Sequence, residues 1–549
     1  MLWEKSSLRC PPEFNHITCV IHSDPQVHKV FNMSSIEILA QKRPDKVAAV
    51  IADTGEYLTY SQLHERSARL AVRLAAQFAQ GETIALLLNN RLEYFEVCFA
   101  ARRAGLYYVP VSTHLNANEL DYILADSGAK VLFTESRCLS LLAALPTERL
   151  QALKVLCVDQ EAPKLASAAS SDSYHHWVSQ GPVPSLPQRN LGLDFAYSSG
   201  TTGRPKGIRH AMSGDKAMEA AMKTAGWASF FQLDEKSVYL SPAPLYHAAP
   251  LRFSIRCISN GGGVVVMQKF DAEAALYTIE KYHVTHSQWV PTMFVRLLNL
   301  DESIRQAYDL SSHRLALHAA APCPIEVKQQ MLKWWGPIIW EYYTGSERAG
   351  ATTISPQEWL EHPGSVGRAA QGTLHIVDTN GQECLPGEEG LVCFEGGPRF
   401  SYHNDPAKTA EAHTPQGWAT FGDIGRVDVQ GYLYLTDRRA NMIISGGVNI
   451  YPQETENVLL VHPLVHDVAV IGVPHPEFGE EVKAVVELRD PTQASEVTAR
   501  QLIEYCREKL SHVKCPRSVD FATGLPRTEN GKLLKRLIRD QYRARSATR

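Results

Sequence analysis

The sequence predicts an α/β protein with largely parallel, buried strands, and three observations support this class. Short apolar segments of strand length alternate with helical segments from Ser35 onward, as in sheets whose strands are joined by helices. From about Gly372 the pattern changes to short strands and turns, which indicates a β-rich subdomain. After Asp437 the chain has the pattern of a compact α/β unit. The 549 residues are enough for about three or four structural units.

The expected elements follow one another at regular intervals. Ser34 and Ser35 precede a helical run to Lys42 and can cap its first turn. Thr59 opens a second helix, which extends to about Gln77. The other expected elements are a helix at 93–104 and strands at 47–51, 84–88, 107–111, 130–134, 263–267, 285–290, 373–377, 390–394 and 432–436. Residues 161–188 are rich in Ser, Ala and Pro and are expected to connect two sublayers.

Composition and charge argue against several classes of function. The formal net charge is -4 and no long basic run occurs, so the chain lacks the positive surface that nucleic-acid binding needs. No apolar stretch reaches the roughly 18 residues of a membrane span, and neither end of the sequence carries a recognisable targeting signal. The eleven cysteines are scattered without a C-x-x-C pair, as expected for reduced thiols in a cytoplasmic enzyme.

The most informative segment runs from Tyr197 to Gly207 and reads Y-S-S-G-T-T-G-R-P-K-G. Its glycines let backbone N–H groups approach a ligand, its hydroxyls add short donors, and Lys206 adds positive charge. We therefore expect a loop that wraps a polyphosphate rather than a polar surface turn. It is not a Walker loop, because Lys206 is followed by Gly207 and not by a hydroxyl residue that would hold magnesium.

Other motifs accompany this loop in a fixed order. They are Y-Y-T-G-S-E-R at 342–348, T-F-G-D at 420–423, D-R at 437–438 with I-I-S-G-G-V-N-I-Y-P after it, and P-R-T-E-N-G-K at 526–532. An aromatic side chain can stack on a purine, and a carboxylate can hold Mg²⁺ against phosphate oxygens. A carboxylate on a tight turn, such as Asp423, suits a ribose diol. Each motif is weak alone, but together they are specific.

With these motifs the chain resembles the adenylate-forming superfamily, and within it the bacterial fatty-acid-type acyl-CoA synthetases; the resemblance covers Ser35 to Arg536. It implies a large N-terminal domain at 1–436, with two α/β layers plus a β-rich subdomain, and a small mobile C-terminal α/β domain at 437–549. In this family a carboxylic acid attacks the α-phosphate of ATP and releases pyrophosphate. Coenzyme A then displaces AMP from the acyl-adenylate. The implied cofactors are ATP, Mg²⁺ and coenzyme A, and a homodimer is expected.

The resemblance also implies a set of nucleotide-binding residues. The predicted set is Ser198, Ser199, Gly200, Thr201, Thr202, Gly203 and Lys206 around the β- and γ-phosphates, Ala320, Ala321, Pro322 and Tyr343 around adenine, and Asp423 and Arg438 at the ribose. Two departures from the family pattern occur. Thr344 stands where glycine is common, and Asn441 stands where an aspartate is often found.

The remaining roles implied by the resemblance concern catalysis and domain motion. Ser346 would contact the α-phosphate, Glu347 would hold Mg²⁺, and His247 would form the gate of the acyl pocket. Asp437 would be the hinge of the C-terminal domain. Lys532 would bridge the substrate carboxylate and the α-phosphate, and Gly446 and Gly447 would let the pantetheine arm of coenzyme A pass.

A cation at Lys532 would meet a physical need of this reaction. Two unit charges about 4 Å apart interact by roughly 4 kcal/mol at an effective dielectric near 20, so a carboxylate and a phosphate repel strongly as they meet. A lysine between them offsets that repulsion, and loss of such a group costs on the order of 10²–10³ in rate. The alternative is that Lys532 is a solvated member of a basic tail with Lys535, Arg536 and Arg539.

Several alternatives stay open at this stage. His247 could be a core histidine, Gly446 and Gly447 could form only a hairpin turn, and Trp289 and Met293 could be core or acyl-pocket residues. The protein could also donate its acyl-adenylate to a separate carrier protein, act as a luciferase-like oxygenase, or be a silent nucleotide-binding regulator. The resemblance suggests a medium, long or bulky acid, but the sequence does not identify it.

Overall fold

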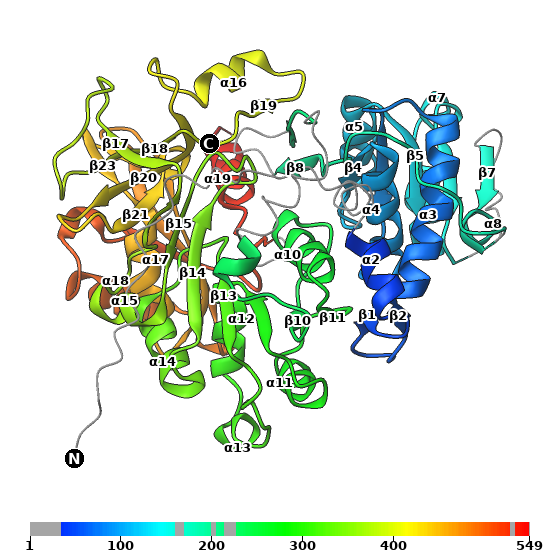
Figure 1. The fold of residues 1–549 in the computed structure, drawn as a ribbon. Coiled ribbons are helices and arrows are strands. Elements are labelled where there is room, and N and C mark those ends of the chain that lie inside the picture. Colours follow the sequence, from blue (N-terminus) through cyan, green and yellow to red (C-terminus); the bar gives the residue numbers. More distant parts are fainter. Residues whose placement is uncertain are drawn as a thin grey trace.

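The computed structural model describes residues 35–159, 170–179, 181–198, 205–212, 227–527 and 533–547. They form a mixed α/β structure, in which the N-terminal helices and a five-stranded sheet lie to one side (blue to cyan in Figure 1). The predicted α/β class is therefore confirmed. The strand expected at 47–51 and the helix expected at 93–104 have the predicted bounds.

The largest sheet has nine strands in the order β16-β15-β14-β13-β12-β10-β11-β1-β2. Their bounds are β16 Arg368–Gln371, β15 Ala351–Ile354, β14 Ile339–Thr344, β13 Leu315–His318, β12 His286–Trp289, β10 Val238–Ser241, β11 Gly263–Val266, β1 Val47–Ile51 and β2 Tyr57–Thr59. The six strands from β14 to β1 pair in parallel, whereas β2, β15 and β16 are antiparallel. The buried apolar strands of the sequence are thus the parallel centre of this sheet.

A second sheet is wholly parallel and has the order β4-β3-β5-β6-β7. Its strands are β4 Tyr107–Pro110, β3 Thr83–Leu87, β5 Ala129–Thr134, β6 Lys154–Cys157 and β7 Ser170–Ser173. The associated helices are α2 Ser35–Lys42, α3 Tyr60–Gln77, α4 Glu93–Ala104, α5 Ala117–Ser127, α6 Leu139–Ala143, α7 Thr147–Gln151 and α8 Tyr174–Ser179. Thr59 caps α3 through a reciprocal capping box with Gln62, which explains why the helix begins there.

The largest hydrophobic core joins these two sheets through α3 and α4. On the large sheet, α11 Ala272–Lys281, α12 Pro291–Leu298 and α14 Ile325–Trp335 pack into a separate core with β10, β11 and β13. Short helices α13 Glu302–Arg305 and α15 Pro356–Glu361 lie beside them in the chain. The expected connection at 161–188 was partly wrong, since β7 and α8 lie inside it. Burial of Tyr174 and Trp177 explains why this polar segment is ordered there.

Two smaller sheets follow the large one. The predicted β-rich subdomain is an antiparallel sheet in the order β17-β18-β20-β21, with β17 Thr373–Val377, β18 Gly390–Glu395, β20 Ala419–Val427 and β21 Leu433–Arg438. A three-stranded sheet joins β19 Ser401–Tyr402, β9 Lys206–Arg209 and β8 Ala196–Ser198, and α16 Pro406–Glu411 follows β19. This sheet therefore pairs β19, which is distant in the sequence, with β9 at the end of the glycine-rich segment.

The C-terminal part has its own sheet, in the order β23-β22-β25-β24 with β26 beside β25. Its elements are β22 Ile443–Ser445, β23 Val448–Ile450, α17 Pro452–Leu460, β24 Val465–His475, β25 Gly479–Leu488, α18 Glu496–Arg507, β26 Ser518–Phe521 and α19 Lys535–Ala547. Separate hydrophobic clusters pack it, as expected of an independent unit. Among the described residues no helix is long and apolar enough to cross a membrane.

Candidate active site

One cavity of about 2450 Å³ brings together many of the predicted site residues. Those that line it are Ser198, Lys206, His247, Ala320, Ala321, Pro322, Tyr343, Ser346, Glu347, Asp423, Asp437 and Arg438. Ser199, Gly200, Thr201, Thr202, Gly203 and Lys532 lie outside the described residues. The lining segments follow the carboxyl ends of the parallel strands β10, β12, β13 and β14. This is the edge at which open α/β sheets bind ligands.

The predicted adenine and ribose residues are directly connected. The Tyr343 hydroxyl donates to Oδ2 of Asp423 at 2.6 Å, and Nε of Arg438 lies 3.1 Å from Oδ1 of the same carboxylate. Burial and the neighbouring carboxylate raise the pKa of Tyr343 well above its usual value, so its hydroxyl stays a donor. Ala320, in the predicted adenine wall, has a φ of 76°, a backbone conformation that costs a non-glycine residue on the order of 1 kcal/mol.

The turn after β14 carries Ser346 and Glu347 and is fixed by buried ions. Arg252 donates to Oδ2 of Asp194 through Nε at 2.9 Å and Nη2 at 2.7 Å, and Arg348 pairs with the other oxygen. Arg252 also donates to the carbonyl of Ser346 at 3.3 Å. Arg348 itself has a φ of 58°, so the ion pair holds a strained backbone beside Glu347. Neither Asp194 nor Arg252 was predicted from the sequence.

The described ends of the glycine-rich segment form a hairpin, in which Ser198 pairs with Lys206. Lys206 Nζ lies 4.9 Å from the ring centre of Tyr402, and the Tyr402 hydroxyl donates to Oε1 of Glu347 at 2.8 Å. Burial, and then repulsion by Lys408, lowers the pKa of Lys206. The predicted phosphate lysine and the predicted metal carboxylate thus share one neighbour, Tyr402, which the sequence analysis did not identify.

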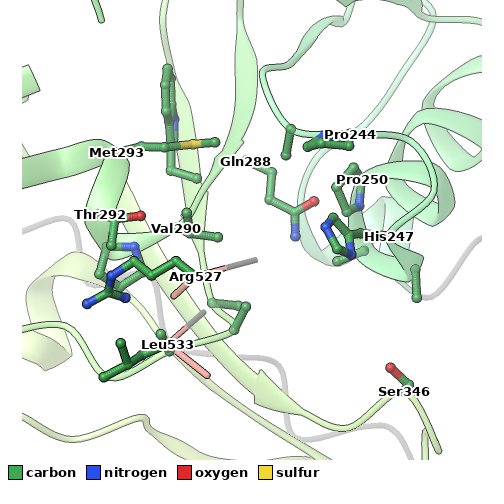
Figure 2. Close-up of a pocket in the computed structure, with 18 of the residues that line it drawn as sticks. Pro244, His247, Pro250, Gln288, Val290, Thr292, Met293, Ser346, Arg527 and Leu533 are labelled. Carbon is green, nitrogen blue, oxygen red and sulfur yellow. The ribbon is translucent and has the colours of Figure 1, made fainter. Parts of the chain in front are cut away.

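The far end of the cavity lies between α10 (Ala248–Ser259) and the ends of β12 and β14. His247 precedes α10 and faces Gln288 across the cavity, with Pro244 and Pro250 beside it (Figure 2). Met293 is 3% exposed and Trp289 is 1% exposed; both line the cavity and both belong to the core packed with α12, so the core and pocket alternatives hold together. Gln288 was missed because a single polar residue in a buried strand carries no recognisable motif.

The C-terminal part closes the cavity opposite these strands. Arg527 and Leu533, which flank the segment outside the described residues, line the cavity near Val290 and Thr292 (Figure 2). Arg527 and Leu533 also form an isolated antiparallel bridge. Nε of Arg527 lies 2.6 Å from Oδ2 of Asp467, which fixes its position. The sequence neighbours of Lys532 therefore lie at the same cavity as His247.

Asp437, near the end of β21, contacts the C-terminal unit through its side chain. Its carboxylate accepts hydrogen bonds from the backbone N–H of Arg438 at 2.6 Å and of Gln453 at 3.0 Å, and from the side-chain amide of Asn441 at 3.0 Å. Gln453 lies in the first turn of α17, where a carboxylate is favourable. An aspartate at 441 could not donate this bond, so the departure from the family pattern adds a contact.

Gly446 and Gly447 form the exposed tip of the β22–β23 hairpin, with φ of 55° and 81°. Positive φ at both central residues is the geometry of a tight two-residue hairpin turn, which glycine favours. They are not among the residues that line the cavity. The hairpin alternative is therefore correct as a description of the local structure, and the predicted contact with coenzyme A stays a prediction.

The parallel sheet, the β8–β9 pair and the cluster of Tyr343, Asp423 and Arg438 together fit an enzyme that activates its substrate with a nucleotide. Residues 36–399 match the family described as AMP-binding enzyme, and residues 454–532 match the AMP-binding enzyme C-terminal domain. The chain belongs to this family, within its acid–CoA ligase branch. The predicted resemblance is therefore confirmed.

Named relatives agree with this assignment. Feruloyl-CoA synthase of Amycolatopsis sp is 35% identical over 506 residues, which cover 90% of this chain and 96% of that protein. A long-chain-fatty-acid–CoA ligase of Mycobacterium tuberculosis is 31% identical over 516 residues, or 91% and 96% of the two chains. The solved o-succinylbenzoate CoA synthetase of Bacillus subtilis, in complex with its acyl-adenylate intermediate, has a TM-score of 0.76 at 27% identity, covering 92% and 98%.

Proposed function

We propose that the protein activates a carboxylic acid as its acyl-adenylate and then transfers the acyl group to coenzyme A. The observation that carries this proposal is the single cavity lined by Lys206, Ser346, Glu347 and the Asp423–Arg438 pair. A carboxylate oxygen would attack the α-phosphorus of ATP, and the bond to pyrophosphate would break. The coenzyme A sulfur would then attack the acyl carbonyl as a thiolate, and AMP would leave with the bonding electrons.

Individual roles follow from position in the cavity. Ser198 to Lys206 would hold the departing phosphates, Tyr343 and the 320–322 wall would hold adenine, and Asp423 with Arg438 would bind the ribose. The buried carboxylate of Glu347 is an oxygen ligand of the kind Mg²⁺ prefers, so the residues present fit that ion. Mg²⁺ would neutralise charge on the phosphate oxygens. Ser346 would contact the α-phosphate and Lys532 would offset repulsion between the two anions.

The acyl end of the cavity supports a compact, ring-bearing acid among the medium, long or bulky acids expected from the sequence. The Gln288 side chain accepts a hydrogen bond from the Tyr239 hydroxyl at 3.1 Å and donates to the Tyr342 hydroxyl. The rings of Phe231 and Phe253 pack behind Tyr342, with centres 6.4 and 5.7 Å from it. These rings close the cavity behind Gln288, which favours a compact acyl group over a long alkyl chain. Two relatives are named for the aromatic feruloyl and o-succinylbenzoate groups, and a third is named for long-chain fatty acids.

We place the boundary of the mobile domain at residue 437, which gives domains at 1–436 and 437–549 with Asp437 as hinge. Rotation there would move Arg527 and Leu533, and the segment between them, away from the cavity and bring the Gly446–Gly447 hairpin toward it for the second step. A cytoplasmic location is proposed because the nine cysteines of the described ranges are free thiols. A homodimer is proposed as well, and light scattering after gel filtration would test it.

The experiment that tests the function measures pyrophosphate release with a panel of acids, with and without coenzyme A. We expect release with ring-bearing acids, and acyl-CoA only when coenzyme A is present. Straight-chain acids of increasing length should react progressively more slowly. If no acid releases pyrophosphate, the enzyme assignment fails. If acyl-adenylate forms but coenzyme A is never acylated, the ligase assignment fails. The protein would then be assigned as an acyl-adenylate donor to a carrier protein or as an oxygenase.

A further inference from the structure

Tyr402 links two residues that the proposed function places at the phosphates. Its hydroxyl donates to Oε1 of Glu347 at 2.8 Å, and its ring lies under Nζ of Lys206, 4.9 Å from the ring centre. All three residues line the same cavity. Tyr402 comes from β19, far from both partners in the sequence, so no local motif explains the contact.

The position of Tyr402 is fixed from several directions. Its strand pairs with β9, so that Tyr402 lies opposite Ile208 and Ser401 opposite Arg209. Its backbone N–H donates to Oγ1 of Thr409 at 2.9 Å, and its ring meets Phe400 edge to face at 5.5 Å. The residue is only 9% exposed. The hydroxyl therefore cannot move away from Glu347 without disturbing the strand.

We propose that Tyr402 is a positioning residue, which fixes Oε1 of Glu347 and so leaves Oε2 as the oxygen for a divalent cation on ATP. The proposal rests on the proposed function for the role of Glu347. The geometry is that of an orienting partner, because the phenol donates its hydrogen bond to one carboxylate oxygen only.

The same ring also limits the position of Lys206. An ammonium group over an aromatic face is attracted by its negative centre, and this attraction strengthens where water is excluded. The ring of Tyr402 therefore positions the lysine and its hydroxyl positions the carboxylate. These two roles can be separated, because phenylalanine keeps the ring and removes only the hydroxyl.

The test measures binding of Mn²⁺, as a probe for Mg²⁺, to the enzyme–ATP complex by electron paramagnetic resonance. The variants are Tyr402→Phe, Glu347→Gln and the double variant. Removal of a partner that orients a metal ligand weakens metal binding or activity by about 10–100-fold, so Tyr402→Phe should weaken Mn²⁺ binding at least tenfold. In the Glu347→Gln background, Tyr402→Phe should change Mn²⁺ binding less than about twofold, because the effects of substitutions at two coupled residues do not add.

The matched control is Tyr432→Phe. Tyr432 is also buried and donates to a carboxylate, Oε1 of Glu358 at 3.2 Å, but neither residue lines the cavity. This variant should bind Mn²⁺–ATP as the wild type does. In pyrophosphate release, Tyr402→Phe should shift the Mg²⁺ dependence to higher concentration, whereas a merely structural defect would lower kcat at every concentration.

Three outcomes separate the hypotheses. If Glu347→Gln weakens Mn²⁺ binding and Tyr402→Phe does not, the positioning role is wrong and the metal role of Glu347 stands. If neither variant changes Mn²⁺ binding, both roles are wrong. If the wild type binds Mn²⁺–ATP with the expected variant pattern but activates no acid, the inference is supported and the proposed reaction is wrong.

Discussion

At the scale of single residues, Asp194 is a buried carboxylate that pairs with two guanidinium groups beside the site. Burial alone would raise its pKa, but the guanidinium groups of Arg252 and Arg348 hold that pKa well below its usual range. The carboxylate is therefore ionised in the folded protein and pairs with both guanidinium groups. Because Arg252 also contacts the carbonyl of Ser346, the ion cluster connects stability to the geometry of the turn that carries Ser346 and Glu347.

We predict that Asp194→Asn lowers the free energy of unfolding by about 3–5 kcal/mol, because it leaves buried guanidinium charge uncompensated. Urea unfolding followed by circular dichroism measures this. The control is Asp121→Asn, which breaks a more exposed ion pair with Arg149 (2.7 Å) and should cost at most about 1 kcal/mol. Equal losses in the two variants would contradict the special role of Asp194.

At the scale of elements, the sequence pattern predicted those helices and strands whose bounds depend on neighbouring residues in the chain. Helix α4 and strand β1 have the predicted bounds because their apolar residues follow one another in the sequence. Strand β19 has only two residues and exists because β9, remote in the chain, supplies its partner. Tyr402 was missed for that reason. The motif residues Tyr343 and Asp423 were predicted, but their mutual hydrogen bond depends on how β14 and β20 are placed.

A buried ionic cluster joins β13, β14 and α14 beneath the predicted adenine wall. Oε2 of Glu341 lies 2.6 Å from Nζ of Lys328 and 3.2 Å from Nε2 of His318. Burial would raise the pKa of Glu341, but His318 and Lys328 together lower it to about 2. The three elements are thus held together by one carboxylate that must remain ionised.

This cluster predicts a defined loss of stability in acid. An unfolded glutamate has a pKa near 4.3, so the stabilising contribution of Glu341 is complete above that pH and is lost as pH falls toward 2. Glu341→Gln should be less stable than the wild type at pH 6, and the difference should shrink by pH 3. Thermal midpoints at both pH values measure this. A difference that is the same at pH 3 and pH 6 would contradict the assignment.

At the scale of the whole molecule, the arrangement of the two parts determines which residues share the cavity. Leu533 and Arg527 of the C-terminal part line it, whereas Gly446 and Gly447 of the same part do not. In this arrangement the C-terminal part therefore brings Arg527 and Leu533 to the cavity but not the Gly446–Gly447 hairpin, which would need a second arrangement to reach it. Asp437, hydrogen-bonded to Asn441 and to the first turn of α17, lies where the two parts join.

If the C-terminal part moves between the two half-reactions, Lys532 should matter in only one of them. We predict that Lys532→Ala slows pyrophosphate release about 10²–10³-fold, because the repulsion between carboxylate and phosphate is no longer offset. Thioester formation from supplied acyl-adenylate should be largely spared, since that step needs the lysine to have left. Single-turnover assays of each step measure this, with Lys509→Ala as the control. Equal loss of rate in both steps would contradict the proposed movement of the C-terminal part. It would mean that Lys532 stays at the reacting groups and serves both half-reactions.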